Sequence, residues 1–256
     1  MGIAYNPGVV TSNMILCLDP ANIKSYNAGI STTNFKDLIT NSTSTNVGDF
    51  GYDTTSYGVP VLTLNTNTGA GTTALSSNGQ VQVVTQNLNT IAVNQNFTVM
   101  FAAKKNFHGL SGNNNGNSQL FQGVSNGYNT GWRIYDNNQG TPGNVFSSRH
   151  SWGFGYNDIN TGLTVNDTAS STNRMCIVAF TVSPTTIFGF CNGTTNSRSN
   201  PLTYASGTST PRISFTGAGA GSWNGFLGYF AIYDRALSLQ EIQQNYNALK
   251  SRFINT

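Results

Sequence analysis

The sequence predicts an all-β protein, a sandwich or barrel of antiparallel strands that ends in one C-terminal helix. Short apolar or alternating segments recur along the chain, with Gly, Asn, Ser and Thr turn signals between them. Only the last stretch shows the spacing of an amphipathic helix. Nothing between the strand segments offers the helices of a parallel βαβ sheet, so an antiparallel architecture is expected.

The predicted strands are short and evenly spread. The clearest segments are Met14–Leu18, Val59–Leu64, Val81–Thr85, Phe97–Ala103, Leu120–Val124, Gly131–Tyr135, Trp152–Tyr156, Met175–Val182, Thr186–Cys191, Arg212–Phe215 and Phe226–Tyr233. Alternate residues are apolar in Phe97–Ala103, and again from Cys176 to Val182. Because successive side chains of a strand point to opposite faces, this pattern predicts strands that bury one face.

The C-terminal helix is predicted over about residues 238–253. Its apolar stripe consists of Leu239, Ile242, Tyr246, Leu249 and Phe253. Ser238 followed by Glu241 three residues later predicts a capping box at the start. We expect the stripe to dock either on the sandwich or on a neighbouring subunit.

Length and composition favour one domain over residues 1–256 and exclude two classes of partner. All-β domains commonly reach roughly 200–250 residues. Only 8% of the residues are charged, the net charge is +3, and no basic run is longer than Lys104–Lys105. Nucleic-acid binding needs a basic stripe, so it is not expected. No run of 18 apolar residues occurs, so no membrane span is expected.

The three cysteines are predicted to be buried free thiols. If 176–182 pairs with 186–191 around the Ser183–Thr186 turn, Val178 faces Cys191 and Cys176 lies diagonal to it. A diagonal neighbour is roughly 7–8 Å away at Cα, which is too far for an unstrained disulfide. Free thiols, with an N-terminus that lacks the pattern of a secretory signal, favour assembly in a reducing cytoplasm.

Three stretches carry a family resemblance. "LCLDPANIKSY" (Leu16–Tyr26) followed by "FKDL" (Phe35–Leu38), "FTVMFAAK" (Phe97–Lys104) and the run Trp223–Phe253 lie at the beginning, middle and end. Together they resemble the concanavalin-A-like lectin/glucanase superfamily, in the laminin-G-like form found in bacteriophage virion proteins. The resemblance implies a jelly-roll β-sandwich with a short C-terminal helix, covering the whole chain.

The same resemblance implies a place and a set of partners. It leads us to expect a phage structural protein made in the host cytoplasm and carried on the virion surface, as a capsid decoration or a tail, baseplate or fibre component. Its partners would be other virion proteins, through a homo-oligomer or lattice docking, and a host surface glycan. The alternative is a lectin-type adhesin that recognises carbohydrate.

Enzymatic activity is not expected. The glucanases of this superfamily resemble one another in a Glu-x-Asp-x-x-Glu strand, and glycoside hydrolysis generally needs two paired carboxyl groups. Here Glu241 is the only glutamate, and the eight aspartates include no alternating pair on a strand. The two histidines, His108 and His150, have no Gly-x-Ser-x-Gly nucleophile motif beside them.

Aromatic residues are the candidates for sugar binding. Trp152, Trp132, Tyr156 and Tyr128 could each present a ring to a pyranose beside amide or carboxylate partners. The alternative for each is core packing, since large aromatic side chains usually bury most of their area.

Oxygen-rich loops are the candidates for a metal. Asp158, Asn160 and Asp167 could supply the carboxylate and carbonyl ligands that Ca²⁺ prefers, and laminin-G-like domains often bind this ion. The alternative is that these residues form turns. The expected cofactor is therefore either none or Ca²⁺.

Overall fold

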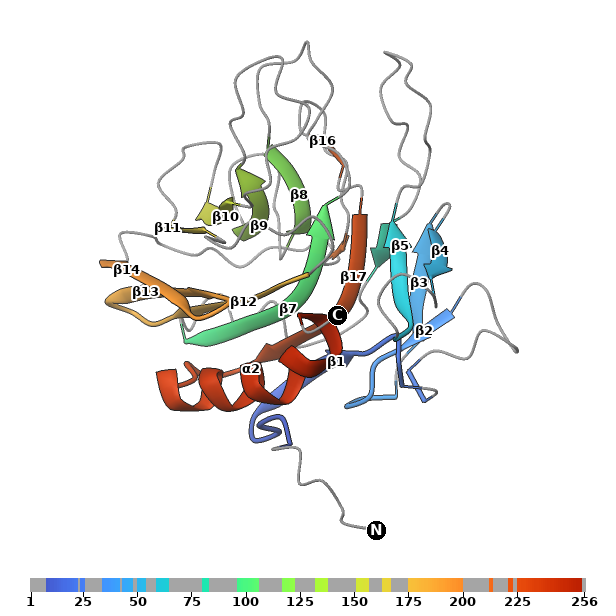
Figure 1. The fold of residues 1–256 in the computed structure, drawn as a ribbon, viewed down its shortest axis with the longest axis horizontal. Coiled ribbons are helices and arrows are strands. Elements are labelled where there is room, and N and C mark those ends of the chain that lie inside the picture. The colour runs from blue at the N-terminus through green and yellow to red at the C-terminus, as the bar shows by residue number, and fades with distance from the viewer. Residues whose placement is uncertain are drawn as a thin grey trace.

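Two antiparallel β-sheets pack against one another, and helix α2 (Leu239–Phe253) lies across the outer face of the first sheet (Figure 1). The computed structural model describes residues 8–22, 24–25, 34–41, 43–47, 50–53, 59–64, 80–82, 96–105, 117–122, 132–137, 151–156, 163–166, 175–199, 212–213, 221–222 and 225–254. The predicted all-β sandwich with a C-terminal helix is confirmed. No helix in the described residues is long and apolar enough to span a membrane.

The first sheet contains the strands that carry α2. Its order is β14 (Thr194–Ser199), β13 (Thr186–Cys191), β12 (Cys176–Val182), β7 (Phe97–Lys105), β17 (Gly225–Tyr233), β5 (Val61–Leu64) and β4 (Phe50–Asp53). Strand β1 (Met14–Leu18) also pairs with β17, so segments from the two ends of the chain lie side by side.

The second sheet covers the opposite face of the core. Its order is β11 (Leu163–Asn166), β10 (Ser151–Tyr156), β9 (Trp132–Asn137), β8 (Asn117–Gln122), β15 (Arg212–Ile213), β6 (Gln80–Gln82), β3 (Thr43–Val47) and β2 (Asn34–Lys36). Strand β16 (Gly221–Ser222) adds to β8 in the parallel direction.

Strand β12, inside the first sheet, is buried on both faces, whereas its alternating sequence pattern predicts that only one face is buried. All seven residues of β12 are buried. Val178 and Phe180 belong to the cluster between the sheets, whereas Ile177 and Ala179 belong to a second cluster beneath α2. The apolar residues on the helix-facing side of β12 therefore share a cluster with Ile242, Leu249 and Phe253 of the predicted stripe, so the helix docks on its own sandwich. Leu239, the first residue of the predicted stripe, is instead 53% exposed.

The buried carboxylate of Asp37 connects β1 to the turn that follows β2. Its oxygens accept hydrogen bonds from the backbone N–H of Cys17 (2.8 Å), Ile39 (3.1 Å) and Thr40 (3.1 Å), and from the Thr40 hydroxyl (2.6 Å). The side chain is 2% exposed, so these four donors replace the water that burial removes.

Asp19 ties the N-terminal segment to the helix. Its carboxylate accepts two hydrogen bonds from the Arg252 guanidinium at 2.6 and 3.0 Å, in the bidentate geometry that makes such pairs strong. The Ser25 hydroxyl accepts from the Asp19 N–H and donates to the Lys36 carbonyl. Asp19 and Ser25 therefore connect the N-terminal segment to α2 and to β2.

The three thiols are free and buried, as the sequence predicts. Val178 pairs with Cys191 across β12 and β13, and the Ser183–Thr186 turn closes through a 2.8 Å bond from Ser183 N–H to the Thr186 carbonyl. Burial raises the pKa of the Cys17 thiol to about 12, so this thiol stays protonated.

Candidate functional site

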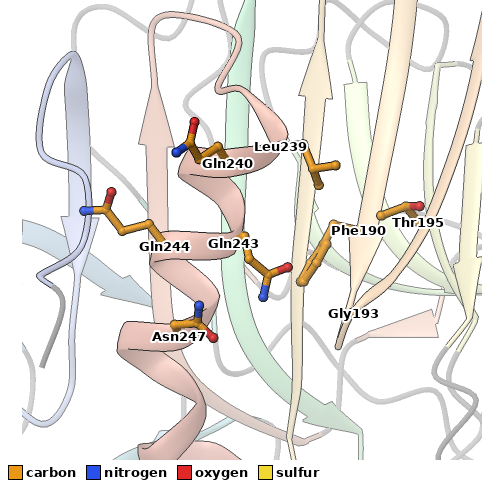
Figure 2. Close-up of a pocket in the computed structure, with 8 residues that line it drawn as sticks. All are labelled: Phe190, Gly193, Thr195, Leu239, Gln240, Gln243, Gln244 and Asn247. Atoms are coloured by element: carbon orange, nitrogen blue, oxygen red, sulfur yellow. The ribbon is translucent and has the colours of Figure 1, made fainter.

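An open groove of about 960 Å³ separates α2 from the hairpin formed by β13 and β14. Figure 2 shows this groove with its side chains. The residues that line it are Phe190, Gly193, Thr195, Leu239, Gln240, Gln243, Gln244 and Asn247. None of these eight residues is charged. The volume of the groove is in the range of small-molecule binding sites.

The hairpin wall of the groove is set by a tight turn. Asn192 and Gly193 connect β13 to β14 with φ angles of 46° and 97°, the left-handed pair that a type I′ turn requires. The Asn192 side-chain carbonyl accepts a 2.8 Å hydrogen bond from the Ile177 N–H, which fixes the turn to β12. Thr195 then pairs directly with Phe190 and is exposed.

The helix wall of the groove is one stripe of α2. Leu239, Gln243 and Asn247 follow one another at four-residue intervals, so they lie on the same side of the helix, about 5–6 Å apart. In Figure 2, Leu239 and Gln243 are directed toward the hairpin, whereas Gln244 extends to the opposite side of the helix. Gln244 donates there to the Gly8 carbonyl at 2.9 Å.

The start of α2 is held by a buried hydroxyl. The Thr98 hydroxyl donates to the Arg235 carbonyl (3.0 Å) and accepts from the Leu237 N–H (2.9 Å). Its single proton is used in this way, so the Thr181 hydroxyl donates to Thr98 across 3.1 Å. The connection between β17 and α2 is thereby fixed to the middle of the sheet.

The predicted capping box is confirmed. The Ser238 hydroxyl accepts from the Glu241 N–H, and the Glu241 carboxylate accepts from the Ser238 N–H at 2.9 Å. Glu241 also binds Arg235 with two hydrogen bonds of 2.6 and 2.9 Å. This contact with Arg235, more than any other, holds the pKa of Glu241 at about 2.

The polar groups of the groove are available to a ligand. Within the described part of the chain, the amides of Gln240, Gln243 and Asn247 make no hydrogen bond to the protein. A carboxamide offers two donors and one acceptor oxygen, and the Thr195 hydroxyl both donates and accepts. The groove can therefore bind a ligand whose own groups donate and accept at close spacing.

Apolar surface lies beside these amides. Leu239 is 53% exposed, one of two large apolar side chains with high exposure in the described residues. The buried ring of Phe190 forms the floor and contacts Tyr246 edge-on, with ring centroids 5.3 Å apart. The groove thus combines a rigid aromatic floor, an exposed aliphatic side chain and uncharged polar groups.

Comparisons with known proteins show the fold. No protein-family model matches the sequence, and no curated protein matches it as a relative. Among solved structures, the chain is similar to the binding domain of botulinum neurotoxin DC in complex with rat synaptotagmin II (TM-score 0.61, 16% identity, 93% of this chain and 52% of that chain). It is also similar to the botulinum neurotoxin type G receptor binding domain (TM-score 0.55, 16% identity, 91% of this chain and 51% of that chain).

A third similar structure contains a bound ligand. It is the binding domain of botulinum neurotoxin DC in complex with SialylT (TM-score 0.56, 14% identity, 93% of this chain and 52% of that chain). This chain spans about half the length of these neighbours. At such identities the likeness shows a shared β-sandwich.

The structure brings together three of the four predicted aromatic residues on neighbouring strands. Trp132 on β9 pairs with Tyr156 on β10, and Trp152 lies four residues before Tyr156 on the same strand. Phe154 lies between Trp152 and Tyr156 on β10, and it pairs with Ile134 on β9 and Leu163 on β11. Ile134 and Leu163 are both buried in the core. Tyr128 lies outside the described residues.

The predicted calcium ligands, Asp158, Asn160 and Asp167, all lie outside the described residues. Within the residues that are described, no group of three or more His, Cys, Asp or Glu side chains could hold a metal ion.

The sequence analysis missed the groove, although two signals pointed to it. The dipeptide Asn192–Gly193 between an apolar strand and a Thr-rich segment is a strong hairpin signal. The helix also carries several uncharged amides outside its buried positions, where charged side chains are usual for a surface helix: Gln240, Gln243, Gln244 and Asn247. Neither signal shows that the two elements meet.

Proposed function

We propose that this protein is a non-enzymatic carbohydrate-binding β-sandwich carried on a virion surface. The observation that carries the carbohydrate-binding part is the groove between α2 and the β13–β14 hairpin. The amides of Gln240, Gln243 and Asn247 have no hydrogen-bond partner among the described residues, and Leu239 is exposed beside them. Sugar hydroxyls donate and accept hydrogen bonds, and so do carboxamides, which makes the two groups complementary. A pyranose also has an apolar face of C–H groups, which Leu239 can contact.

The neighbouring structures support a binding role. Two of them are described as binding domains, one with a protein ligand and one with SialylT, and a third is described as a receptor binding domain. The sandwich shared with this chain therefore occurs in domains that are described by what they bind.

Three of the described carboxylates have structural partners, which supports the proposal of a non-enzymatic protein. Asp37 is buried under four donors, Asp19 is bound to Arg252, and Glu241 is bound to Arg235. With its pKa at about 2, Glu241 is ionised at neutral pH and cannot serve as a proton donor. Each of these three carboxylates has a structural role. Glycoside hydrolysis instead uses two carboxyl groups that face one another across the scissile bond.

The place on a virion rests on the sequence resemblance to laminin-G-like phage proteins. Immunogold electron microscopy of particles from the source tests it, with an antibody to this chain. Label on the head would indicate capsid decoration, and label on the tail or fibres would indicate a role in host adsorption. Particles without label would contradict the virion assignment and favour an adhesin at a cell surface.

Carbohydrate binding is tested with a glycan array probed with the wild-type protein and with the double variant Gln243→Ala/Asn247→Ala. We expect the wild type to bind a defined subset of glycans and the double variant to lose about tenfold or more in affinity, the equivalent of roughly 1.4 kcal/mol. Ser251→Ala, on the same helix but outside the groove, is the control and keeps wild-type binding. A wild-type protein that binds no glycan would contradict the proposal.

A further inference from the structure

We infer that the groove between α2 and the β13–β14 hairpin selects uncharged saccharides and discriminates against those that end in a carboxylate. This inference rests on the proposed carbohydrate-binding function and names the class of ligand. It follows from the charges and contacts of the residues around the groove.

None of the described residues that line the groove carries a positive charge. Its eight lining residues carry amide, hydroxyl, aromatic and aliphatic groups, together with the backbone of Gly193. A carboxylate that enters such a site loses part of its hydration without a counter-charge, which is costly. Neutral hydroxyl groups lose less on transfer, and the amides of Gln243 and Asn247 can replace their bonds to water.

The cations of the helix and the segment just before it are engaged elsewhere. Arg235 is bound in two hydrogen bonds to Glu241, and Arg252 is bound in two to Asp19. Lys250 lies over the ring of Tyr246, 6.0 Å from its centroid. Each of these side chains would have to leave a partner before it could meet an acidic sugar.

The N-terminus of α2 does not substitute for a cation. Unpaired N–H groups and the helix dipole usually favour an anion at this end of a helix. Here the Glu241 carboxylate already lies in the first turn and accepts from the Ser238 N–H, while the Ser238 hydroxyl accepts from the Glu241 N–H. The Glu241 carboxylate, paired with Arg235, therefore already occupies the position that a ligand anion would take at this end of the helix.

Matched saccharide pairs test the inference. The probes are neutral oligosaccharides and the same oligosaccharides extended by sialic acid, measured with the full-length protein. We expect the neutral member to bind about tenfold or more tightly than its acidic counterpart, a difference of roughly 1.4 kcal/mol. Acidic members that bind equally well or better would overturn the inference and leave carbohydrate binding intact. Absence of binding to both members of every pair would overturn the proposed function as well.

A charge placed in the groove tests the site itself. Gln243→Lys adds a cation at the centre of the lining, and Ser251→Lys adds the same charge on the same helix outside it. We expect Gln243→Lys to narrow or reverse the preference for neutral members, and Ser251→Lys to keep it. Identical behaviour of the two variants would overturn the assignment of selectivity to this groove.

Discussion

Asn245 is a buried amide that joins three segments of the chain. Its Nδ2 donates to the Tyr233 hydroxyl (3.1 Å), and its Oδ1 accepts from the Val10 N–H (2.6 Å). The Tyr233 hydroxyl in turn donates to the Val10 carbonyl (3.0 Å), which closes a ring of hydrogen bonds between the N-terminal segment, β17 and α2. The side chain of Asn245 is fully buried, so no water can replace these bonds.

Replacement of Asn245 by Ala is expected to lower the free energy of unfolding by about 1–3 kcal/mol, since it leaves a buried donor at Val10 without an acceptor. Urea denaturation followed by circular dichroism measures this. Asn247→Ala is the matched control, because its half-buried amide has no protein partner, and its expected change is within about 0.5 kcal/mol. Equal losses in the two variants would contradict the role given to Asn245.

The ion pair at the start of α2 has a predictable pH dependence. Because the pKa of Glu241 falls from an ordinary 4.5 to about 2 on folding, its contribution to stability is complete above about pH 4.5 and is lost as the pH falls toward 2. Glu241→Gln is expected to be less stable than the wild type by roughly 0.5–1 kcal/mol at pH 7. Urea denaturation at several pH values should show the difference disappearing near pH 2, and a constant difference would argue against the pair.

The packing of α2 on the first sheet depends on one glycine. A Cβ atom at Gly228, in the bulged part of β17, would collide with the Phe253 ring and lie 3.0 Å from the Met175 sulfur. Phe253 is fully buried and belongs to the cluster beneath the helix. The close approach of strand and helix therefore requires a residue without a side chain at this position.

Gly228→Ala is expected to destabilise the fold by about 1–3 kcal/mol through overpacking against Phe253. Thermal and urea unfolding measure the loss. In the background of Phe253→Leu, where the ring is absent, the same substitution should cost less. An unchanged cost in that background would contradict steric overlap with Phe253 as the cause.

Strands with a strong apolar pattern could be predicted from the sequence, and polar ones could not. The predicted bounds of β1 and β13 agree with the structure, because their apolar residues and flanking turns define them. Strand β14 consists of Thr, Asn, Ser and Arg residues, five of which are exposed, so it carries no alternation of burial. The half-buried pattern inferred for β12 was wrong because the helix that covers its second face is remote in sequence.

The candidate site could be predicted only in part, for the same physical reason. The capping box and the helix are local features, and the sequence defines both. The groove forms where residues 190–195 meet residues 239–247, and this contact depends on the docking of α2 on the first sheet. Such a long-range contact has no local pattern in the chain, so Gln243 and Asn247 could not be recognised as neighbours of Phe190.

Residues near the beginning and near the end of the chain pack and pair with one another, and we therefore expect them to unfold together. Strand β1 pairs with β17, and the segment around Val10 is bound by α2. Cys17, Cys176 and Cys191 are all buried, and they lie on three different strands of the first sheet, β1, β12 and β13. Their exposure therefore requires opening of the sheet.

Thiol labelling tests this cooperativity. With a disulfide reagent at pH 8, the three cysteines are expected to stay unreacted in the native protein and to react completely in denaturant. Across a urea titration, the labelling of all three should follow the loss of circular dichroism. Early reaction of one thiol would show that its strand opens independently.

The proposed carbohydrate-binding groove is tested most directly by NMR of the ¹⁵N-labelled protein titrated with a neutral glycan that it binds. We predict that the side-chain NH₂ signals of Gln243 and Asn247 shift with the same dissociation constant as binding measured by calorimetry. The indole N–H signals of Trp132 and Trp152 are expected to stay in place. Shifts of the indole signals, with those of Gln243 and Asn247 unchanged, would contradict the groove and place the sugar at the aromatic residues of β9 and β10.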